Sequence, residues 1–291
     1  MLAFVQVFTS GVAIGCVYGL VALSFVLIYK ATETVSFMQG DLLMVGAFTG
    51  LALNLLLGLP LWLAAPAAVL AVAVLGALLE RLALRRAIGQ PHLVAVLLTF
   101  GLGMMLRGSV ASIPAAAQET YRLPIAADTL AIGPLVLAAS HVWVVVVTLV
   151  LAAALAAFFR HTRTGRVLRA CSEDAGTAAL LGWPVARMHT LAWALGAAVA
   201  AVAGLLLAPV TFVHLNMGFV ALKAFPAAVL GGLTSLPGAL LGGVFLGVVE
   251  ALAGLLLPEG VKDVVPYALL MVALLLFPQG LGAGRAARAS V

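Results

Sequence analysis

Charge is scarce in this sequence. Only 9% of the 291 residues are Asp, Glu, Lys or Arg, whereas 65% are apolar. An ordinary soluble domain has about 25% charged and about 45–50% apolar residues. So much apolar surface cannot be hidden inside one globule of this size, and bilayer lipid must therefore be the main solvent. The composition excludes secreted, disulfide-framework and disordered proteins and predicts an all-α polytopic membrane protein.

Cysteine, lysine and catalytic motifs are rare or absent as well. The two cysteines, Cys16 and Cys171, lie far apart, and the five histidines share no ligand spacing, so the sequence predicts no metal site. The only lysines are Lys30, Lys223 and Lys262, and none precedes the Ser or Thr that a P-loop requires. The motifs His-Glu-x-x-His and Gly-x-Ser-x-Gly are also missing. We therefore expect no cofactor and no enzymatic activity in this chain itself.

Long apolar runs are what the sequence has instead. Each run has about the 17–25 residues that a helix needs to cross the hydrocarbon, and none alternates as barrel strands do. We expect about nine transmembrane helices, within a range of eight to ten, because the runs 42–59 and 219–236 are short and contain glycine. The runs cover residues 5–29, 42–59, 61–79, 93–113, 135–159, 190–213, 219–236, 238–257 and 264–281.

The basic residues lie mainly on one side of this nine-span arrangement. Because loops rich in Lys and Arg remain in the cytoplasm, we expect the N-terminus outside and the C-terminus in the cytoplasm. The net charge of +5 thus reports orientation in the membrane and does not indicate binding to nucleic acid. The basic residues assigned to the cytoplasm are Lys30, Arg81, Arg85, Arg86, Arg160, Arg163, Arg166, Arg169, Arg187, Arg285 and Arg288. The loops assigned to the outside contain Glu119, Arg122 and Asp128, and Glu259, Lys262 and Asp263.

The longest polar interruption is the stretch 160–189, on the cytoplasmic side. Its middle is predicted to form one short helix, with Ser172 as the N-cap and two carboxylates in the first turn, where they complement the helix dipole. Gly182 suits the helix end. A short helix with small side chains can dock into a groove of another protein, and a solvated loop is the alternative. Its candidate contact residues are Ser172, Glu173, Asp174, Ala178, Ala179 and Gly182.

Glycines recur at intervals of four within several runs. Such faces let helix backbones approach closely in lipid. We expect packing within this chain, with packing against a second membrane subunit as the alternative. Gly231-Gly232 and Pro237-Gly238 interrupt the end of the seventh run and predict a broken or partly re-entrant helix, which a membrane tolerates only where protein or water surrounds it. The spaced glycines are Gly11/Gly15/Gly19, Gly46/Gly50, Gly238/Gly242 and Gly243/Gly247.

Three charged residues fall well inside the runs. A charge at the centre of a span costs about 2.5–3.5 kcal/mol on insertion scales, so Arg107, Lys223 and Glu250 are not expected to face lipid. Either Glu250 pairs with Arg107 or Lys223 inside the bundle, or these groups border a hydrated cavity. If they border such a cavity, a polar group of residues around the second run is expected to line its cytoplasmic gate. This group comprises Ser36, Gln39, Asp41 and Thr99.

Four stretches of the chain carry a resemblance to a known family. They read RACSED at 169–174 followed by AALLG at 178–182, IYKATETVSFMQGDLLMVGAF at 28–48, LTFGL at 98–102, and AFPAAVLGGLTSLPGALLGGVFLG at 224–247. In this order and spacing, over essentially the whole length, the chain resembles the first permease subunit of bacterial branched-chain amino-acid ATP-binding-cassette importers. The stretch from 169 resembles the coupling loop of such permeases.

The resemblance implies a fold, a location and partners. It implies a single transmembrane permease domain over 1–291, with its coupling loop at 160–189, in the bacterial inner membrane. It also implies a second permease subunit that is a different chain, two cytoplasmic ATPase subunits and a periplasmic solute-binding protein. Ser36 and Met38 stand where the family commonly has Asn and Ala, and Pro226 is unusual in its run. Relatives carry urea, short amides or other small polar solutes, which stay as alternatives to a branched-chain amino acid.

Two other function classes are less well supported by the residues. An ion-coupled secondary transporter would need acidic groups at mid-membrane, and Glu250 alone is thin support. A membrane-embedded enzyme would need a cluster of ionisable groups. The docking-type helix in the cytoplasmic stretch favours a permease that obtains its energy from a separate ATPase.

Overall fold

The computed structural model describes residues 2–87, 90–113, 129–132, 135–258 and 260–276. Each of the nine apolar runs contains a helix in this structure. Six of the described helices, α1, α3, α4, α6, α9 and α11, are long and apolar enough to cross a membrane. The nine helices are α1 (Leu2–Thr32), α2 (Gln39–Leu55), α3 (Leu61–Leu82), α4 (His92–Ala111), α6 (Ala139–His161), α9 (Val185–Thr211), α10 (Val220–Gly231), α11 (Leu236–Leu256) and α12 (Val265–Leu276).

Shorter elements connect these helices. Within the described part of the chain, the strands β1 and β2 form one antiparallel ribbon in which Thr129 pairs with Ala138. The end of the predicted ninth run, the loop with Glu119, Arg122 and Asp128, and the tail with Arg285 and Arg288 lie outside the described residues. The connecting elements are η1 (Leu84–Ala87), β1 (Thr129–Ile132), β2 (Leu135–Ala138), α7 (Arg163–Glu173), α8 (Ala175–Leu180), η2 (Leu215–Phe219) and η3 (Val261–Val264).

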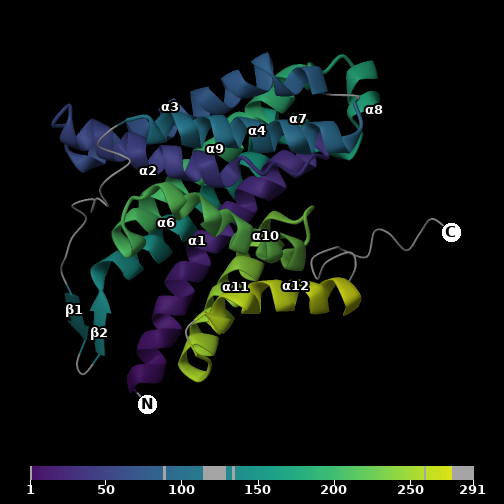
Figure 1. The fold of residues 1–291 in the computed structure, drawn as a ribbon. Coiled ribbons are helices and arrows are strands. Elements are labelled where there is room, and N and C mark those ends of the chain that lie inside the picture. Colours follow the sequence, from purple (N-terminus) through teal and green to yellow (C-terminus); the bar gives the residue numbers. More distant parts are fainter. Residues whose placement is uncertain (1, 88–89, 114–128, 133–134, 259, 277–291) are drawn as a thin grey trace.

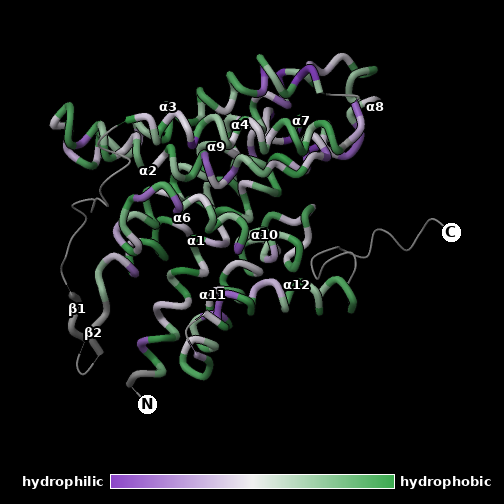
Figure 2. Tube along the Cα trace, in the orientation of Figure 1, coloured by the Kyte–Doolittle hydropathy of each residue, from purple (hydrophilic) through white to green (hydrophobic). Residues whose placement is uncertain are grey.

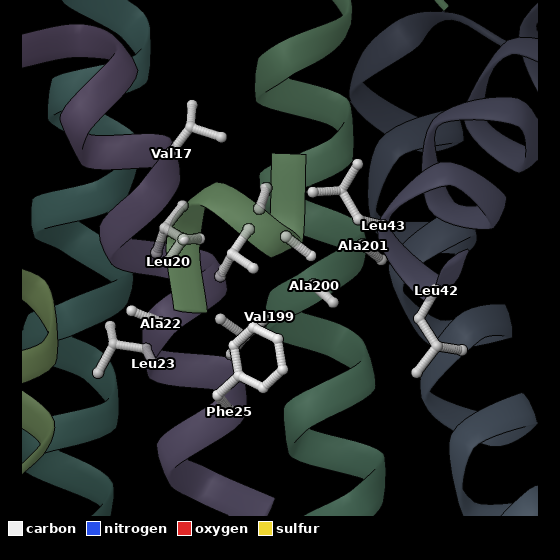
Figure 3. Packing of buried hydrophobic residues seen from close by; sticks show 14 of the residues in the cluster. Val17, Leu20, Ala22, Leu23, Phe25, Leu42, Leu43, Val199, Ala200 and Ala201 are labelled. Atoms are coloured by element: carbon white, nitrogen blue, oxygen red, sulfur yellow. The ribbon is translucent and has the colours of Figure 1, made fainter. Parts of the chain in front are cut away.

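Helix α1 is the central element of the bundle. It runs from the lower edge of the molecule in Figure 1 up to the layer that contains α2, α3, α4 and α9, and it packs most extensively against α11 and then α9. Figure 3 shows α9, with Val199, between Leu20 of α1 and Leu42 of α2, and these three residues are buried. A helix that is apolar all round belongs in such an interior position.

The spaced glycines bring helices of this chain together, as expected from the sequence. A Cβ atom at Gly243 or Gly247 would collide with backbone atoms of Gly19 or Gly15, and a Cβ at Gly46 would collide with Ala201 of α9. Close backbone approach of this kind favours van der Waals packing between helices in lipid. Packing within the chain is therefore confirmed for these glycine faces.

Two helices begin part-way along their neighbours. The segment 33–38 after α1 returns into the bundle, because Phe37 N–H donates to Thr99 Oγ1 of α4 (3.2 Å), and a Cβ at Gly103 would stand 3.5 Å from Met38 Cα. Gly103 is about 17 Å along α4 from its first residue, at 1.5 Å per residue. Helix α2 thus starts beside the middle of α4.

Helix α10 is the second short helix, and it confirms the predicted break. Its 12 residues span about 18 Å, less than the hydrocarbon thickness of about 30 Å. The helix ends at Gly231, the next residue, Gly232, has a φ of +88°, and α11 begins at Leu236. At its other end, Gly218 of η2 lies against Gly40 of α2, so the starts of α2 and α10 meet inside the bundle.

The polar stretch 160–189 differs from the sequence prediction. It forms two helices, α7 and α8, and not one helix capped by Ser172. Ser172 lies within α7, where its hydroxyl donates to Arg169 O (2.7 Å). Asp174 is the N-cap of α8, because its carboxylate accepts from Thr177 N–H (2.9 Å) and its backbone is extended. Asp is among the strongest N-cap residues, so the helix break falls two residues later than predicted.

Candidate translocation site and coupling helices

Arg107 and Asp41 form an ion pair where α4 passes the start of α2. Arg107 Nε lies 3.2 Å from Asp41 Oδ1, and its guanidinium carbon stands 4.4 Å from the centre of the Phe219 ring. A cation over an aromatic face is stabilised by the ring quadrupole, more strongly where water is excluded. The pair is partly accessible, with 22% of the Arg107 and 14% of the Asp41 side chain exposed.

A cavity of about 220 Å³ borders this ion pair, and we call it the Asp41–Arg107 cavity. It lies between α1, the start of α2, α4 and the start of α10. Apart from the two charged groups, its wall is mainly aromatic. The aromatic residues that line it are Phe25, Phe37, Phe100, Phe219 and Phe225.

Glycines make room for the two charged side chains. A Cβ atom at Gly103 of α4 would collide with the Asp41 carboxylate, and a Cβ at Gly218 would stand 3.0 Å from an Arg107 terminal nitrogen and 3.0 Å from Gly40 O. Larger residues at either position would push the pair apart or displace the start of α2. The sequence analysis missed Gly103 and Gly218, since neither belongs to a glycine pair at intervals of four.

The other expected gate residues are buried beside this cavity and do not line it. Ser36 and Gln39 are inaccessible, and none of their side-chain polar atoms has a hydrogen-bond partner among the described residues. Thr99 accepts from Phe37 N–H and donates to Val96 O (2.8 Å). Thr99 therefore fixes the position of the segment before α2.

Lys223 and Glu250 form a second ionic cluster nearer the end of α11. Lys223 Nζ donates to Glu250 Oε1 (2.8 Å). The other carboxylate oxygen, Glu250 Oε2, accepts from the Tyr18 hydroxyl (2.7 Å). Lys223 also pairs with Asp263 of η3, and this hydrogen bond lowers the pKa of the Asp263 carboxyl below its ordinary value. One of the two expected partners of Glu250 is thus confirmed, whereas Arg107 pairs with Asp41.

A third buried carboxylate lies at the end of the bundle near α7 and was not singled out from the sequence. Glu80 of α3 is 1% exposed and pairs with Arg85 (3.1 Å), and it accepts a hydrogen bond from Thr190 of α9 (2.6 Å). The five-residue spacing between Glu80 and Arg85 and their place at a helix end are the signals that could have revealed this pair.

Hydrophilic segments gather at the end of the bundle beside α7 and α8 in Figure 2, and α7 contributes arginines to them, whereas α8 consists mainly of alanine and other small or apolar residues. On α7, Gly165, Leu168 and Cys171 are buried. On α8, Ala178 is buried, whereas Ala179 and Gly182 are exposed. Hydrogen bonds from the Thr177 hydroxyl and amide lower the pKa of the Asp174 carboxyl, so the cap is charged at neutral pH.

The tip after α8 presents large apolar side chains to the surroundings. Leu180 is 89% and Leu181 is 73% exposed, and Trp183 is also exposed. Gly182 has a φ of +83°, and its N–H donates to Ala179 O (2.9 Å), which closes the helix end as predicted. A group of exposed apolar side chains at the end of the α7–α8 pair is typical of a surface that contacts another protein.

The sequence of this chain is similar to that of known permease proteins. The family model described as "Branched-chain amino acid transport system / permease component" matches residues 7–274. The high-affinity branched-chain amino acid transport system permease protein LivH of Salmonella typhimurium and that of Escherichia coli are each 34% identical over 96% of both chains. The permease protein BraD of Pseudomonas aeruginosa is 31% identical over 96% of this chain and 95% of its own.

One solved structure shares the fold. PsaBC from Streptococcus pneumoniae in complex with Fab superposes with a TM-score of 0.50 at 17% identity, over 94% of this chain and 91% of the other. At that identity the likeness concerns the fold alone.

Proposed function

The chain belongs to the family of permease components of branched-chain amino acid transport systems, and from that premise we propose how it works and with which partners. It forms one half of a translocation path for branched-chain amino acids in the bacterial inner membrane. A second, different permease subunit completes the path, two cytoplasmic ATPases supply the energy, and a periplasmic binding protein delivers the solute. The relatives are named permease proteins, and no lysine of this chain precedes the Ser or Thr of a P-loop. We therefore assign ATP hydrolysis to another chain.

The observation that supports coupling to an ATPase is the α7–α8 pair with its exposed apolar tip. A rigid short helix can pass on a movement of the ATPase, whereas a flexible loop would absorb it. The tip at Leu180, Leu181 and Trp183 supplies the apolar anchor that a docking helix needs at the centre of a contact. We assign contacts with the ATPase to this tip and to Glu173, Asp174, Ala179 and Gly182.

The proposed orientation has nine spans, with the N-terminus outside and the C-terminus in the cytoplasm. Its support is that basic residues from separate loops lie near one end of the bundle. Lys30 and Arg169 line one cavity there, and Arg85 donates to Ala186 O. The positive-inside rule then assigns this end to the cytoplasm.

Transport in a defined strain tests the proposed function. The chain is co-expressed with its proposed partners, an ATPase, a second permease and a binding protein, in a host without its own branched-chain transporters. We expect uptake of radiolabelled L-leucine that requires every component. Uptake of urea or acetamide in place of leucine would reassign the solute. Uptake that persists without the ATPase and stops when the proton gradient is collapsed would indicate a secondary transporter.

A further inference from the structure

The Asp41–Arg107 cavity combines two opposite charges with an aromatic wall. We propose that it is a transient binding site for a single zwitterionic amino acid with an apolar side chain. Arg107 receives the carboxylate of the solute, Asp41 receives the ammonium, and the phenylalanines surround the side chain. This inference rests on the proposed function and adds the site at which the permease itself recognises the solute.

The ion pair leaves hydrogen-bonding capacity for a ligand. A guanidinium has five N–H donors and a carboxylate has about four acceptor positions, but a single contact, from Arg107 Nε to Asp41 Oδ1, joins the two groups in the described part of the chain. Both groups line the cavity. A zwitterion can insert between them with each of its charges matched, so no charge is left unpaired while the solute is bound.

The two charges also indicate that the opening of the cavity does not face lipid. Phe100 and Met104 of α4 and Phe219 are more than half exposed on the side where the cavity opens. A partly accessible arginine beside lipid is costly, and charged groups within spans face the bundle interior or a water-filled cavity. The opening is therefore best placed along the path between the two permease subunits.

The size of the cavity suits one small solute. At about 220 Å³ the cavity is smaller than most small-molecule pockets, which have about 300–1,000 Å³, so it suits a solute of the size of one amino acid. Apolar and aromatic walls with a few placed polar groups are typical of small-molecule sites. A neutral solute such as urea can hydrogen-bond to the two groups but offers neither of them an opposite charge.

The starts of two helices meet at this site. Asp41 lies in the first turn of α2, and Phe219 immediately precedes α10. Helix N-termini carry partial positive charge, and in transporters the N-termini of interrupted helices point at anionic groups of the solute. The start of α10, where Phe219 lies beside Arg107, adds to the attraction that Arg107 exerts on a carboxylate. Because the solute must open an existing ion pair, binding is weak and the site does not trap its cargo.

Photolabelling of the assembled importer tests this site. The complex is illuminated with L-photo-leucine, a zwitterionic leucine with a diazirine on its side chain, and the labelled peptides are mapped by mass spectrometry. We expect label in peptides that contain Met104 and Phe219. Excess L-leucine should suppress it, whereas 3-methylbutylamine, which lacks the carboxylate, and 4-methylpentanoate, which lacks the ammonium, should not. Equal suppression by all three compounds would overturn the proposal.

A double substitution provides the second measurement. Asp41→Asn with Arg107→Gln removes both charges together, leaves no unpaired charge, and should reduce the label about tenfold or more, because hydrogen bonds to charged groups are lost. Glu80→Gln with Arg85→Gln neutralises the matched pair away from the cavity and should leave the label unchanged. Unchanged label in the first variant would also overturn the proposal.

The outcomes separate this inference from the proposed function. If the wild-type complex imports leucine but the label lies elsewhere, the function stands and the site is wrong. If the wild-type complex imports no branched-chain amino acid, the proposed function itself fails. If the Asp41→Asn and Arg107→Gln variant does not assemble, competition among the three compounds on the wild-type complex still decides the question.

Discussion

At the scale of single residues, charge inside the bundle is arranged in pairs drawn from different elements. Arg107 of α4 meets Asp41 of α2, and Lys223 of α10 meets Glu250 of α11. Removing one partner of a buried pair leaves an uncompensated charge, which costs far more than replacing both. Double neutral substitutions are therefore the informative variants for this protein, and single ones mainly report misfolding.

The segment before α2 offers a milder test of the gate. Thr99→Val removes the acceptor for Phe37 N–H, and Gln39→Ala removes a buried side chain whose polar atoms have no partner among the described residues. We expect each variant to lower leucine uptake about two- to fivefold. Thr99→Val loses a hydrogen bond worth about 0.5–1 kcal/mol, and Gln39→Ala loses the packing of a buried side chain. The apparent affinity should not change if, as proposed, a soluble binding protein sets it. Uptake is measured against concentration.

Thr148→Val is the matched control for the gate variants. Thr148 is a fully buried threonine of α6, on a helix that does not line the Asp41–Arg107 cavity, so its loss should not affect the uptake rate. A large change in solute preference in the gate variants would show that selection occurs at the gate and not at the binding protein.

At the scale of elements, contact between α1 and α11 depends on glycine. Gly247→Val would place a side chain into the backbone of Gly15, and neither helix can move without disturbing the core around α1. Overpacking of a tight core costs about 1–3 kcal/mol. We expect a clearly lower melting temperature of the purified protein in detergent.

Gly254→Val on the same helix is the control for that substitution. A Cβ atom there would meet only the end of the Lys262 side chain, at 3.6 Å, so the melting temperature should stay close to that of the wild type. Equal destabilisation by the two variants would show that helix propensity, and not contact with α1, sets the effect.

The tip after α8 is where we expect coupling to the ATPase. Gly182→Trp adds a large side chain at an exposed position with a positive φ, where any other residue is strained. It should abolish leucine uptake and displace or uncouple the ATPase, while membrane insertion stays intact. Co-purification of the ATPase and uptake are measured together.

Gly58→Trp is the matched control for the coupling variant. Gly58 is exposed, has a φ of +61°, and lies in the turn between α2 and α3, away from α8. It carries the same backbone strain and should retain uptake. Normal uptake by the Gly182 variant would support a solvated loop in place of a docking helix.

At the scale of the whole molecule, the ends of the helices sort into two groups. The ends of α1 and α3 and the starts of α4 and α9 contribute residues to one cavity, which contains Glu33, Glu80 and His189. The turn between α2 and α3 and the η3 segment belong to the other group in the nine-span arrangement. The orientation of these two groups in the membrane is open to direct measurement.

Accessibility of introduced cysteines tests the orientation. Leu57→Cys lies in the turn between α2 and α3, and Leu181→Cys lies at the tip after α8; both positions are exposed, whereas the native Cys16 and Cys171 are buried. A membrane-impermeant maleimide should label position 57 in spheroplasts and should label position 181 only after permeabilisation. The reverse pattern at both positions would contradict an N-terminus outside.

The sequence by itself determined the membrane class, the positions of the apolar helices in the described part of the chain, the break after Gly231 and the place of the polar segment 160–189. These are local properties, since hydropathy over about 20 residues decides whether a segment prefers lipid, and glycines followed closely by a proline, as at Gly231-Gly232 and Pro237, disfavour a continuous helix. The order of the family motifs is likewise readable along the chain. The arrangement of charged residues around the Asp41–Arg107 cavity, in contrast, depends on contacts between distant parts of the chain.

Only the tertiary structure decided which charges meet and which polar groups are buried. Arg107 and Asp41 are 66 residues apart, and their pairing depends on α2 starting beside the middle of α4, which no periodicity encodes. The break between α7 and α8 likewise depended on a choice between two adequate caps, Ser172 and Asp174. Helix packing settles such choices, because it buries one arrangement of equally acceptable local structures and exposes the others.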